Sequence, residues 1–439
     1  MSARLPLLAL AVLCAAGLLA PAAHAQPREP IVRVHLLASA APQSVTVTAE
    51  SGPLTIYADR SDRPTTTLSM GETARVEHVS GRLRLRAPSV TLQGDVFEVV
   101  PSRDAPLALR VNGPWKRYRG ALSIERNGAR GALRLINYVP LEAYVSSVVA
   151  SEYPFQEMEG IKAQAVLART YGLRARDRSE PFDVTDDTGS QVYRGADAET
   201  ARSRAAAGAT RGEVLQHRGA LAEATYYSCS GGHTANNEDV WNGAPLSYLR
   251  GRPDPYDRDC PDYRWTTTAP VSGVLRTLSS RYGGVSGIEV ASRATDGRVA
   301  TVHLLGAGRR ISGNEFRAVV NGAYGARTVR STHFTVQRDG GQYVFTGRGF
   351  GHGVGMSQYG ARGQALQGRS YRDILAFYFP GTDVQRHADG PRAVDYAAGG
   401  ASGLGGLVPY VPRTAGALQR AADMTPGTER EAQPRRVAW

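Results

Sequence analysis

The chain has 439 residues, 42% hydrophobic and 21% charged, a globular composition that excludes a wholly disordered or collagen-like chain. Its formal net charge is +12, and nearly all of the positive charge is arginine, because Lys116 and Lys162 are the only lysines. A basic surface suits an acidic partner such as nucleic acid, an anionic membrane or an anionic wall polymer. The sequence has no arginine-rich run and no aromatic nucleic-acid motif, so no nucleic-acid partner is expected.

The first residues have the pattern of a secretory signal. Arg4 is the only charged side chain before residue 28, Leu5 to Ala20 are almost wholly apolar, and Ala23-His24-Ala25 offers the small residues of a cleavage site. The stretch is too short for a lasting membrane span. We therefore expect a signal peptide over 1–25 and a mature chain without a membrane span, secreted into the periplasm or associated with the cell wall.

Removal of the signal leaves two cysteines, Cys229 and Cys260. In an exported protein such a pair predicts first a disulfide bond, which would stabilise the fold by roughly 3 kcal/mol. The alternative is a zinc site, since His233 lies four residues after Cys229. Two thiols and one histidine without a CxxC pair are a weak metal signature, so no metal and no cofactor are expected.

Residues 31–140 alternate apolar and polar side chains in short runs separated by turn residues, the pattern of an antiparallel β domain. Arg82, Arg84 and Arg86 occupy every second position of one run, which predicts the solvated face of a strand. An N-terminal β-rich region is assigned to 26–118.

Helical patterning begins after Pro140. LEAYVSSVVA predicts a short helix that ends before Ser151, and a longer helix is expected over 157–176. Three alanines of this longer helix permit close packing: Ala163, Ala165 and Ala168.

The rest of the chain has three parts that differ in their predicted secondary structure. Residues 182–350 are mixed but mostly β, with a sub-domain at about 266–345, and helical patterning returns at 357–378. The segment 386–439 is rich in Gly, Pro, Ala and Arg and has no period, which predicts a disordered tail.

Three segments contain candidate functional residues. The first is SEYPFQEMEGIKAQAVLARTYGLRAR, which carries Glu152 in the bend between the two predicted helices. Apolar neighbours on both sides would desolvate its carboxyl group, which favours the neutral form and suits it to donate a proton near neutral pH. The local sequence alone favours the simpler alternative, a helix-terminal glutamate exposed to water.

The second segment is YYSCSGGHTANNEDVWNGAPLSYLRG. Its small polar turn, followed by Trp241 and Tyr248, is a mixture that hydrogen-bonds sugar hydroxyls and stacks a sugar ring on an aromatic side chain. The alternative is an ordinary surface loop pinned by Cys229. The G-x-S-x-G pattern of a nucleophile elbow is missing. Cys229 could act as a nucleophile paired with His233, but a disulfide bond would remove its free thiol.

The third segment, TGRGFGHGVGMSQYGARGQALQG, places glycine at every second position from Gly347 to Gly355. In an extended strand this period strips the side chains from one face, which allows another backbone or a polymer to approach closely. The alternative is a flexible linker, although linkers do not interleave glycine with Phe, His and Val. No nucleotide-binding glycine pattern is present.

With these segments the chain resembles the family of stage II sporulation protein D, which includes the amidase-enhancer proteins. The resemblance runs from about Arg119 to Thr382. It is carried by RGALSIER, LINYVPLEAYVSSVVASEYP, GIKAQAVLARTYGL, DDTGSQVYRG, YYSCSGGHTANNEDVW, YLRG, GRGFGHGVGMSQYGARG and SYRDILAFYFPGT. So many segments in order are not expected by chance, and the glycine-rich one is highly specific.

The expected fold class is therefore α+β, mostly antiparallel β with a few helices around a catalytic groove. The catalytic domain of the family type is assigned to 119–385, between the N-terminal β region and the tail.

The resemblance implies a lytic transglycosylase that acts on the glycan strands of peptidoglycan at N-acetylmuramyl bonds and leaves anhydro-muramyl ends. Glu152 aligns with the catalytic glutamate of the family and would act alone as acid and base. The family usually has methionine where this chain has Tyr153, a departure that should alter the pocket wall more than the chemistry. Some members bind zinc near the second segment, but the ligands vary and no metal is carried over.

Further residues are expected to bind the substrate. Lys162 and Arg169 lie on one flank of the longer predicted helix and are expected to anchor a substrate carboxylate or to tune Glu152. The other substrate-binding candidates are Gln191, Tyr193, Ser228, His233, Thr234, Trp241, His352, Gln358 and Tyr359. Three other carboxylates are expected to be solvated: Glu157, Glu159 and Glu238.

Two other classes of function remain open. A binding module would hold glycan strands without cleaving them and enhance a cell-wall amidase, which would then be a second partner. A zinc hydrolase would use Cys229, His233 and Cys260.

Overall fold

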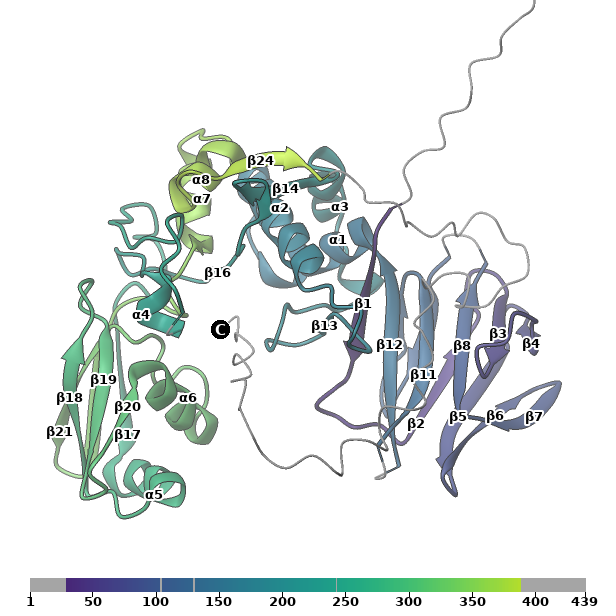
Figure 1. Ribbon diagram of the computed structural model, residues 1–439, viewed down its shortest axis with the longest axis horizontal. Helices are drawn as coiled ribbons and strands as arrows, with labels where there is room; N and C mark the ends of the chain where they lie inside the picture. The colour runs from purple at the N-terminus through teal and green to yellow at the C-terminus, as the bar shows by residue number, and fades with distance from the viewer. Residues whose placement is uncertain (1–28, 103–104, 129–130, 242, 388–439) are drawn as a thin grey trace, which may run out of the picture.

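The computed structural model describes residues 29–102, 105–128, 131–241 and 243–387. The expected signal peptide at 1–25 and residues 388–439 of the expected tail lie outside the described residues. The architecture is α+β, as the sequence predicts, with several mostly antiparallel sheets and a small number of helices (Figure 1). Within the described ranges no helix has the length and apolar character needed to cross a membrane.

Two sheets packed face to face form a sandwich at the right of Figure 1. The seven-stranded sheet has the order β13-β1-β12-β11-β8-β3-β4, and the six-stranded sheet has the order β10-β9-β2-β5-β6-β7. Neighbouring strands are antiparallel except β1 and β13. The strands are β1 (Ile31–Leu36), β2 (Ser44–Thr48), β3 (Leu54–Ala58), β4 (Thr66–Leu68), β5 (Thr73–Val79), β6 (Arg82–Ala87), β7 (Val90–Gly94), β8 (Val96–Pro101), β9 (Leu107–Arg110), β10 (Lys116–Tyr118), β11 (Ala121–Asn127), β12 (Ala132–Pro140) and β13 (Val184–Thr185).

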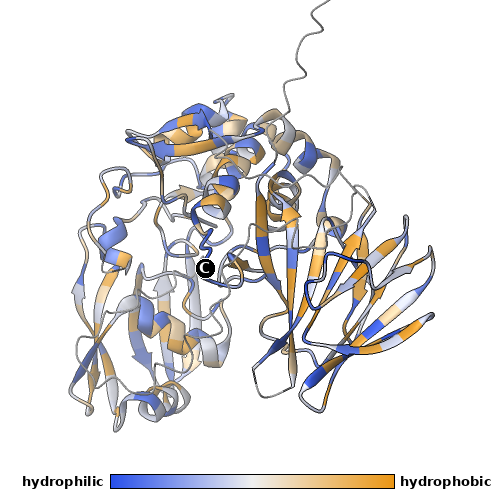
Figure 2. Ribbon diagram, turned by 45° about the vertical axis from the view of Figure 1, so that its right-hand side comes forward, coloured by the Kyte–Doolittle hydropathy of each residue, from blue (hydrophilic) through white to orange (hydrophobic). Residues whose placement is uncertain are grey.

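Period-two alternation builds the core of this sandwich. Val76 and Leu85 point inward from the six-stranded sheet, Val34 and Ile124 point inward from the other, and all four are fully buried. The alternation is visible as orange and blue steps along the strands in Figure 2. The sequence-based boundary between residues 118 and 119 falls inside the sandwich, because β11 and β12 share a sheet with β1.

Helices α1 (Leu141–Glu152), α2 (Met158–Arg174) and α3 (Ala201–Ala209) pack against one another in the centre of the molecule, with a single 3₁₀ turn at Ala196–Ala198. Helix α1 begins immediately after Pro140, where the missing N–H of proline costs no helical hydrogen bond. The three alanines expected to permit close packing are fully buried in α2. Their small side chains let α2 pack closely against its neighbours.

The inserted unit, defined here as residues 265–347, lies at the left of Figure 1 and has its own hydrophobic core. The rings of Phe316, Phe334 and Phe345 meet there with centroids 5.7–6.2 Å apart. Its sheets have the orders β17-β22-β21 and β18-β19-β20. Its elements are β17 (Trp265–Pro270), α5 (Val271–Tyr282), β18 (Gly287–Arg293), β19 (Val299–Leu305), β20 (Arg309–Ser312), α6 (Gly313–Tyr324), β21 (Phe334–Asp339) and β22 (Gln342–Gly347).

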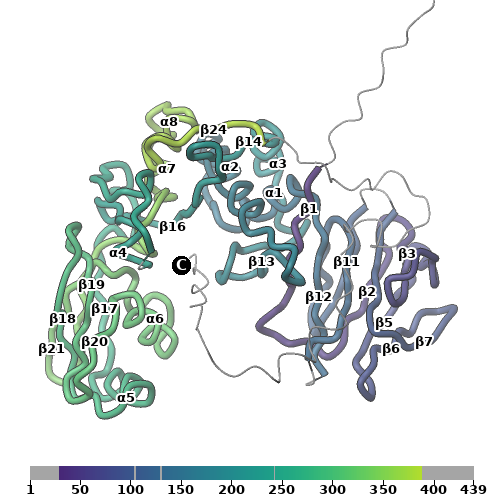
Figure 3. The backbone as a smooth tube through the Cα atoms, in the orientation of Figure 1, coloured from purple at the N-terminus to yellow at the C-terminus, as the bar shows by residue number. Residues whose placement is uncertain are grey.

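The remaining elements connect the middle of the chain with the end of its described part. Strand β14 (Glu213–His217) pairs with β15 (Ala220–Leu221) and with β24 (Asp383–Arg386), so the end of the described chain returns to its middle (Figure 3). Strand β16 (Tyr226–Tyr227) runs parallel to β23 (Met356–Ser357). The helices of this part are α4 (Asn237–Trp241), α7 (Gln358–Leu366) and α8 (Tyr371–Tyr378). The β16–β23 pairing brings the second segment, which carries Cys229 and His233, beside the third segment, which carries the alternating glycines.

Candidate active site

Glu152 is the last residue of α1, and its carboxyl group is buried. Tyr153 leaves the helical conformation with φ −114° and Pro154 follows, which ends the helix. The residue is 4% exposed. Its Oε1 accepts a hydrogen bond of 2.6 Å from the backbone N–H of Val192, whereas its buried Oε2 has no partner with hydrogen-bond geometry among the described residues. The sequence-level alternative of a glutamate exposed to water is therefore wrong.

Burial raises the pKa of Glu152 from 4.5 to about 7. Three groups oppose this shift by stabilising the charged form: the Val192 N–H, the Tyr226 hydroxyl and the positive charge of Arg194. Because desolvation outweighs them, a large share of the carboxyl groups is protonated near neutral pH. Since Oε1 accepts an N–H, we assign the proton of the neutral form to Oε2.

A chain of buried polar groups leads to this carboxyl group. The Tyr144 hydroxyl donates to Gln191 Oε1 over 2.7 Å, and Gln191 Nε2 donates to the Tyr226 hydroxyl over 3.0 Å. All three side chains are nearly or fully buried. The amide of Gln191 thus holds the Tyr226 hydroxyl in the position from which it stabilises the charged form of Glu152.

The third segment holds the backbone of the same glutamate. Gln358, at the start of α7, donates from Nε2 to the backbone carbonyl of Glu152 over 3.0 Å. His352 Nε2 lies 2.9 Å from the carbonyl oxygen of Tyr226, and His352 Nδ1 accepts the Val354 N–H over 3.1 Å. Burial lowers the pKa of His352 to about 3, so its imidazole is neutral with the proton on Nε2.

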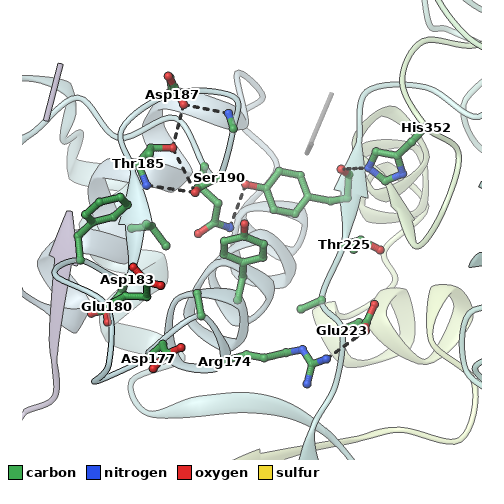
Figure 4. Close-up of a pocket in the computed structure, with 18 of the residues that line it drawn as sticks. Arg174, Asp177, Glu180, Asp183, Thr185, Asp187, Ser190, Glu223, Thr225 and His352 are labelled. Atoms are coloured by element: carbon green, nitrogen blue, oxygen red, sulfur yellow. Dashed lines mark hydrogen bonds and ion pairs between the residues drawn. The ribbon is translucent and has the colours of Figure 1, made fainter. Parts of the chain in front are cut away.

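A cavity of about 800 Å³ lies next to this cluster (Figure 4). Gln191, Tyr226, Trp241 and His352 are among its lining residues, and the Trp241 ring packs 5.0 Å from the imidazole of His352. Glu152 itself is not a lining residue. Its carboxyl group is connected with the cavity by the Tyr226 hydroxyl, which interacts with Glu152, and by Gln191, which is hydrogen-bonded to Tyr226; both of these residues line the cavity.

The polar wall of the cavity is built from short contacts within one loop. Asp187 Oδ1 accepts from the Thr185 hydroxyl and from the Gly189 N–H, each over 2.9 Å. On the opposite side Arg174 and Glu223 form an ion pair at 3.0 Å. Aromatic rings combined with a few oriented polar groups make a surface suited to an organic ligand rich in hydroxyls.

The alternating glycines do not form the extended strand that the sequence predicts. Gly349, Gly351, Gly353 and Gly355 all have positive φ, between 75° and 112°, a conformation that other residues rarely adopt. The predicted close approach does occur: a Cβ on Gly355 would stand 2.2 Å from the carbonyl oxygen of Thr225. The glycines are required by both the turn and the contact.

Of the expected substrate-binding residues, the structure places three on the cavity wall: Gln191, Trp241 and His352. Gln358 is 3% exposed and contacts the backbone of Glu152 instead. These four belong to one cluster around the carboxyl group, although they come from distant parts of the sequence.

Three of the expected roles need correction. Arg169 is wholly buried and binds the Glu142 carboxylate over 2.9 Å and the Glu213 carbonyl over 2.9 Å, so it cannot anchor a substrate. The hydroxyl of Tyr193, a residue that is 2% exposed, donates to Asn137 inside the protein. Lys162 pairs with Glu159 on its own helix at 2.6 Å and does not line the cavity.

The remaining four candidates also lie off the cavity wall and hold the second segment in place. Thr234 Oγ1 accepts the Arg252 N–H over 2.9 Å, and His233 Nδ1 bonds to the Thr234 carbonyl over 2.7 Å. The Ser228 carbonyl accepts the backbone N–H of Tyr359 over 3.1 Å. These contacts are within and between the two motifs, so their main visible role is structural.

The other carboxylates considered from the sequence are all ion-paired. Glu157 pairs with Arg362 at 3.2 Å, Glu159 pairs with Lys162, and Glu238 binds Arg250. Each is partly exposed. Among these carboxylates and Glu152, the last alone combines burial with an oxygen that has no partner.

Cys229 and Cys260 are both buried, and the Cys260 thiol contributes to raising the pKa of the Cys229 thiol. The structure has both as free thiols, so the expected disulfide bond is not formed in it. Burial raises the pKa of the Cys229 thiol, which makes it a poor nucleophile. Within the described residues Cys229, His233 and Cys260 do not make a group able to hold a metal ion.

Sequence reasoning did not single out Tyr226 or Val192, which both contact or influence Glu152. Tyr226 stands inside the quoted second segment and Val192 inside DDTGSQVYRG, but nothing in their local pattern marks them. Their importance arises from the parallel pairing of β16 with β23 and from a loop 40 residues after Glu152.

Comparison with known proteins gives the family. The family model of stage II sporulation protein matches residues 129–217, and that of a domain of unknown function matches 256–355, which overlaps the inserted unit. Stage II sporulation protein D of Bacillus amyloliquefaciens is 35% identical over 269 residues, 57% of this chain and 75% of that protein. Its counterpart in Bacillus subtilis (strain 168) is 32% identical over 58% of this chain and 77% of that protein. The amidase enhancer of the same strain is 28% identical over 72% of this chain and half of its own length. The chain therefore belongs to the stage II sporulation protein D family.

Proposed function

We propose that this protein acts in the cell wall as a lytic transglycosylase, cleaving the glycan strands of peptidoglycan with Glu152 as its acid and base. One observation carries the proposal: a carboxyl group with a pKa of about 7 and an unpartnered oxygen, held next to a cavity of about 800 Å³. The names of the relatives, stage II sporulation protein D and amidase enhancer, support a role connected with the cell wall.

The proposed reaction has two proton transfers. Glu152 Oε2 gives its proton to the bridging oxygen of the N-acetylmuramyl bond while positive charge develops on the sugar ring. The bond to the leaving sugar breaks, and the primary hydroxyl of the muramyl residue attacks the same carbon. The carboxylate of Glu152 takes the hydroxyl proton, which restores the acid and leaves a 1,6-anhydro ring.

The surroundings of Glu152 suit both steps. Before the transfer, desolvation keeps the acid neutral; after it, the Val192 N–H and the Tyr226 hydroxyl stabilise the carboxylate. A single carboxyl group suffices, because the nucleophile belongs to the substrate and is already held close to the reacting carbon. Neutral His352 would offer no proton, so its proposed role is to hold Tyr226 in place.

The test is product analysis on purified glycan strands. Glu152→Gln keeps the shape of the side chain and removes the transferable proton, so we expect the anhydro product to fall by about 100-fold or more. Glu289→Gln, an exposed glutamate on β18 of the inserted unit, is the matched control and should react like the wild type. Wild-type turnover in Glu152→Gln would overturn the assignment.

A second candidate function is glycan binding without cleavage, in support of a cell-wall amidase. It is favoured by the position of Glu152 behind the cavity wall and by the relative named amidase enhancer. Mass spectrometry of the digested glycan separates the two: anhydro ends support the enzyme, and unaltered polymer retained on the protein supports the binding module.

The proposed chemistry needs no cofactor. We expect the anhydro product to form at the same rate after treatment with a chelator. Loss of the anhydro product on chelation, restored by zinc, would contradict the cofactor-free mechanism, and zinc-dependent release of reducing ends would instead support the zinc hydrolase considered from the sequence.

A further inference from the structure

The outer face of the six-stranded sheet is strongly basic. Arg75, Arg84, Arg86 and Arg110, here called the arginine face, point away from the core on three strands, β5, β6 and β9. Their register is continuous: Arg110 lies opposite Thr46, Thr46 opposite Arg75, and Arg75 opposite Arg86. Because neighbouring strands are about 4.8 Å apart, this row extends over roughly 14 Å.

The positive charge of this face is only partly balanced by the carboxylate of Glu77. Glu77 contacts three of the four arginines, with nitrogen–oxygen distances of 2.7 Å to Arg84, 3.5 Å to Arg75 and 3.6 Å to Arg86. A single carboxylate shared by three guanidinium groups leaves an excess of positive charge. Arg75 and Arg86 are both more than half exposed, so their free donors face solvent.

A hollow of about 430 Å³ adjoins the row. Its lining residues include Met70, Trp115, Thr48 and Thr73, and the two threonines lie opposite each other, two residues along from Thr46 and Arg75. Glu50 also lines the hollow, and its carboxylate is paired with Arg117 at 2.6 Å. The Arg110 guanidinium lies over the Trp115 ring, 4.6 Å from its centroid. Met70 is 73% exposed, the most exposed large hydrophobic side chain of the described residues. An aromatic ring and an exposed threonine thus lie beside a row of cations.

We propose that the arginine face and this hollow form a second binding site, for a polysaccharide that carries repeated carboxylate groups. Trp115 and Met70 pack against a sugar ring, the hydroxyl of exposed Thr73 bonds to its hydroxyl groups, and the arginines bind the carboxylates. The identification of this polymer as peptidoglycan, whose muramyl units and peptides carry carboxylates, rests on the proposed function.

The position of the site gives it a distinct role. None of its residues lines the cavity next to Glu152, and the two regions come from different parts of the fold. A strand held at the sandwich would keep its neighbouring segments near the cavity, which raises their effective concentration there.

The test is co-sedimentation with purified peptidoglycan sacculi, using the full chain. The variant Arg75→Gln/Arg86→Gln/Arg110→Gln removes three charges and leaves the Arg84–Glu77 pair intact. The control Arg309→Gln/Arg310→Gln/Arg338→Gln makes the same charge change at exposed positions of the inserted unit. At about 0.05 M salt we expect binding about tenfold weaker in the first variant and unchanged in the control, with the difference lost at about 0.5 M salt.

A second pair of measurements tests the chemistry of the ligand. Converting the carboxylates of the sacculi to amides should weaken binding of the wild type about tenfold and leave the triple arginine variant unaffected. Trp115→Ala should weaken binding to native and amidated sacculi alike. Equal losses in both triple variants, or wild-type binding that does not depend on the carboxylates, would overturn the proposal.

These results stand apart from the proposed catalysis. The binding comparisons are made in the Glu152→Gln background, in which the polymer is not degraded. If the wild type forms no anhydro product while the binding differences persist, the proposed enzyme fails and the second site stands.

Discussion

Glu142 and Glu152 lie ten residues apart on the same helix, and their surroundings give them opposite roles. Glu142 receives the guanidinium of buried Arg169 and forms an ion pair that ties α1 to α2. Glu152 forms no ion pair within the described part of the chain, so burial outweighs the opposing effects of Val192, Tyr226 and Arg194 and raises its pKa to about 7. The difference lies in the neighbours of each carboxyl group.

The raised pKa of Glu152 makes stability depend on pH. An unfolded glutamate titrates near 4.5 and the folded one near 7, so between these values the folded state holds the extra proton. The stability contributed by the neutral carboxyl is therefore full below about pH 4.5 and is lost as pH rises through about 7. Glu152→Gln should be more stable than the wild type at pH 8 by on the order of 3 kcal/mol and nearly equal to it at pH 4.5.

Urea denaturation of both proteins at the two pH values measures this difference. A constant difference across the pH range would contradict the raised pKa. Because both proteins retain every other titrating group, the comparison isolates Glu152.

Tyr226 should set the upper pH limit of activity. Its hydroxyl lowers the pKa of Glu152, so Tyr226→Phe should raise that pKa further and move the alkaline limb of the rate profile to higher pH. Tyr227→Phe is the matched control, because the adjacent hydroxyl is buried without a partner and Tyr227 does not act on Glu152. An unmoved limb in Tyr226→Phe would exclude this role.

Among the elements, the segment of alternating glycines has the least replaceable backbone. It leaves β22 and passes through four glycines of positive φ to reach β23, where it pairs with β16. This path brings His352 against Tyr226 and places Gln358 at the carbonyl of Glu152. The segment therefore positions the acid through the side chains of His352 and Gln358, which bond to the backbone carbonyls of Tyr226 and Glu152.

Two glycines with nearly the same positive φ allow the effect of a close contact to be separated from the effect of backbone strain. Gly355 has φ +80° and a Cβ there would meet the Thr225 carbonyl, whereas Gly368 has φ +79° and open space around it. Gly368→Ala should cost about 1 kcal/mol of unfolding free energy, the penalty of the conformation alone. Gly355→Ala should cost about 3 kcal/mol or more, because backbone must also move. Equal costs in urea denaturation would show that the contact is relieved without loss.

For the whole molecule, the inserted unit is attached to the site by a buried cation. Arg298 is 2% exposed, pairs with Asp296 at 2.9 Å and donates from Nη2 to the carbonyls of His233 and Ser230 over 3.1 Å and 3.3 Å. The inserted unit thus supports the loop of the second segment, although its own core is separate.

Removing this cation should loosen the loop. Arg298→Ala leaves the Asp296 carboxylate buried without its partner, so we expect a loss of about 3 kcal/mol in stability and faster amide hydrogen exchange over 228–236. Arg310→Ala, on an exposed position of the same unit, should change neither. Unchanged exchange in Arg298→Ala would mean that the loop is held by its other contacts.

Much of the architecture was accessible from local pattern. Period-two alternation predicted the sandwich strands, and the alanines of α2 predicted its close packing. The resemblance to the family drew attention to Glu152, and the glycine period indicated a close backbone approach that the structure contains. Local pattern gave the wrong result for Arg169 and Tyr193, because a polar residue in a motif looks the same whether it faces a cavity or the interior.

The sequence by itself determined the α+β class, the family and the identity of the candidate acid, since these depend on side-chain period and on motifs of fixed order. Tertiary structure alone decided which residues surround that acid and how strongly it holds its proton. Its partners Val192 and Gln358 are 40 and 206 residues away, and burial is a property of the packed chain. Desolvation acts through all atoms that exclude water from the carboxyl group, so no short stretch of sequence contains it.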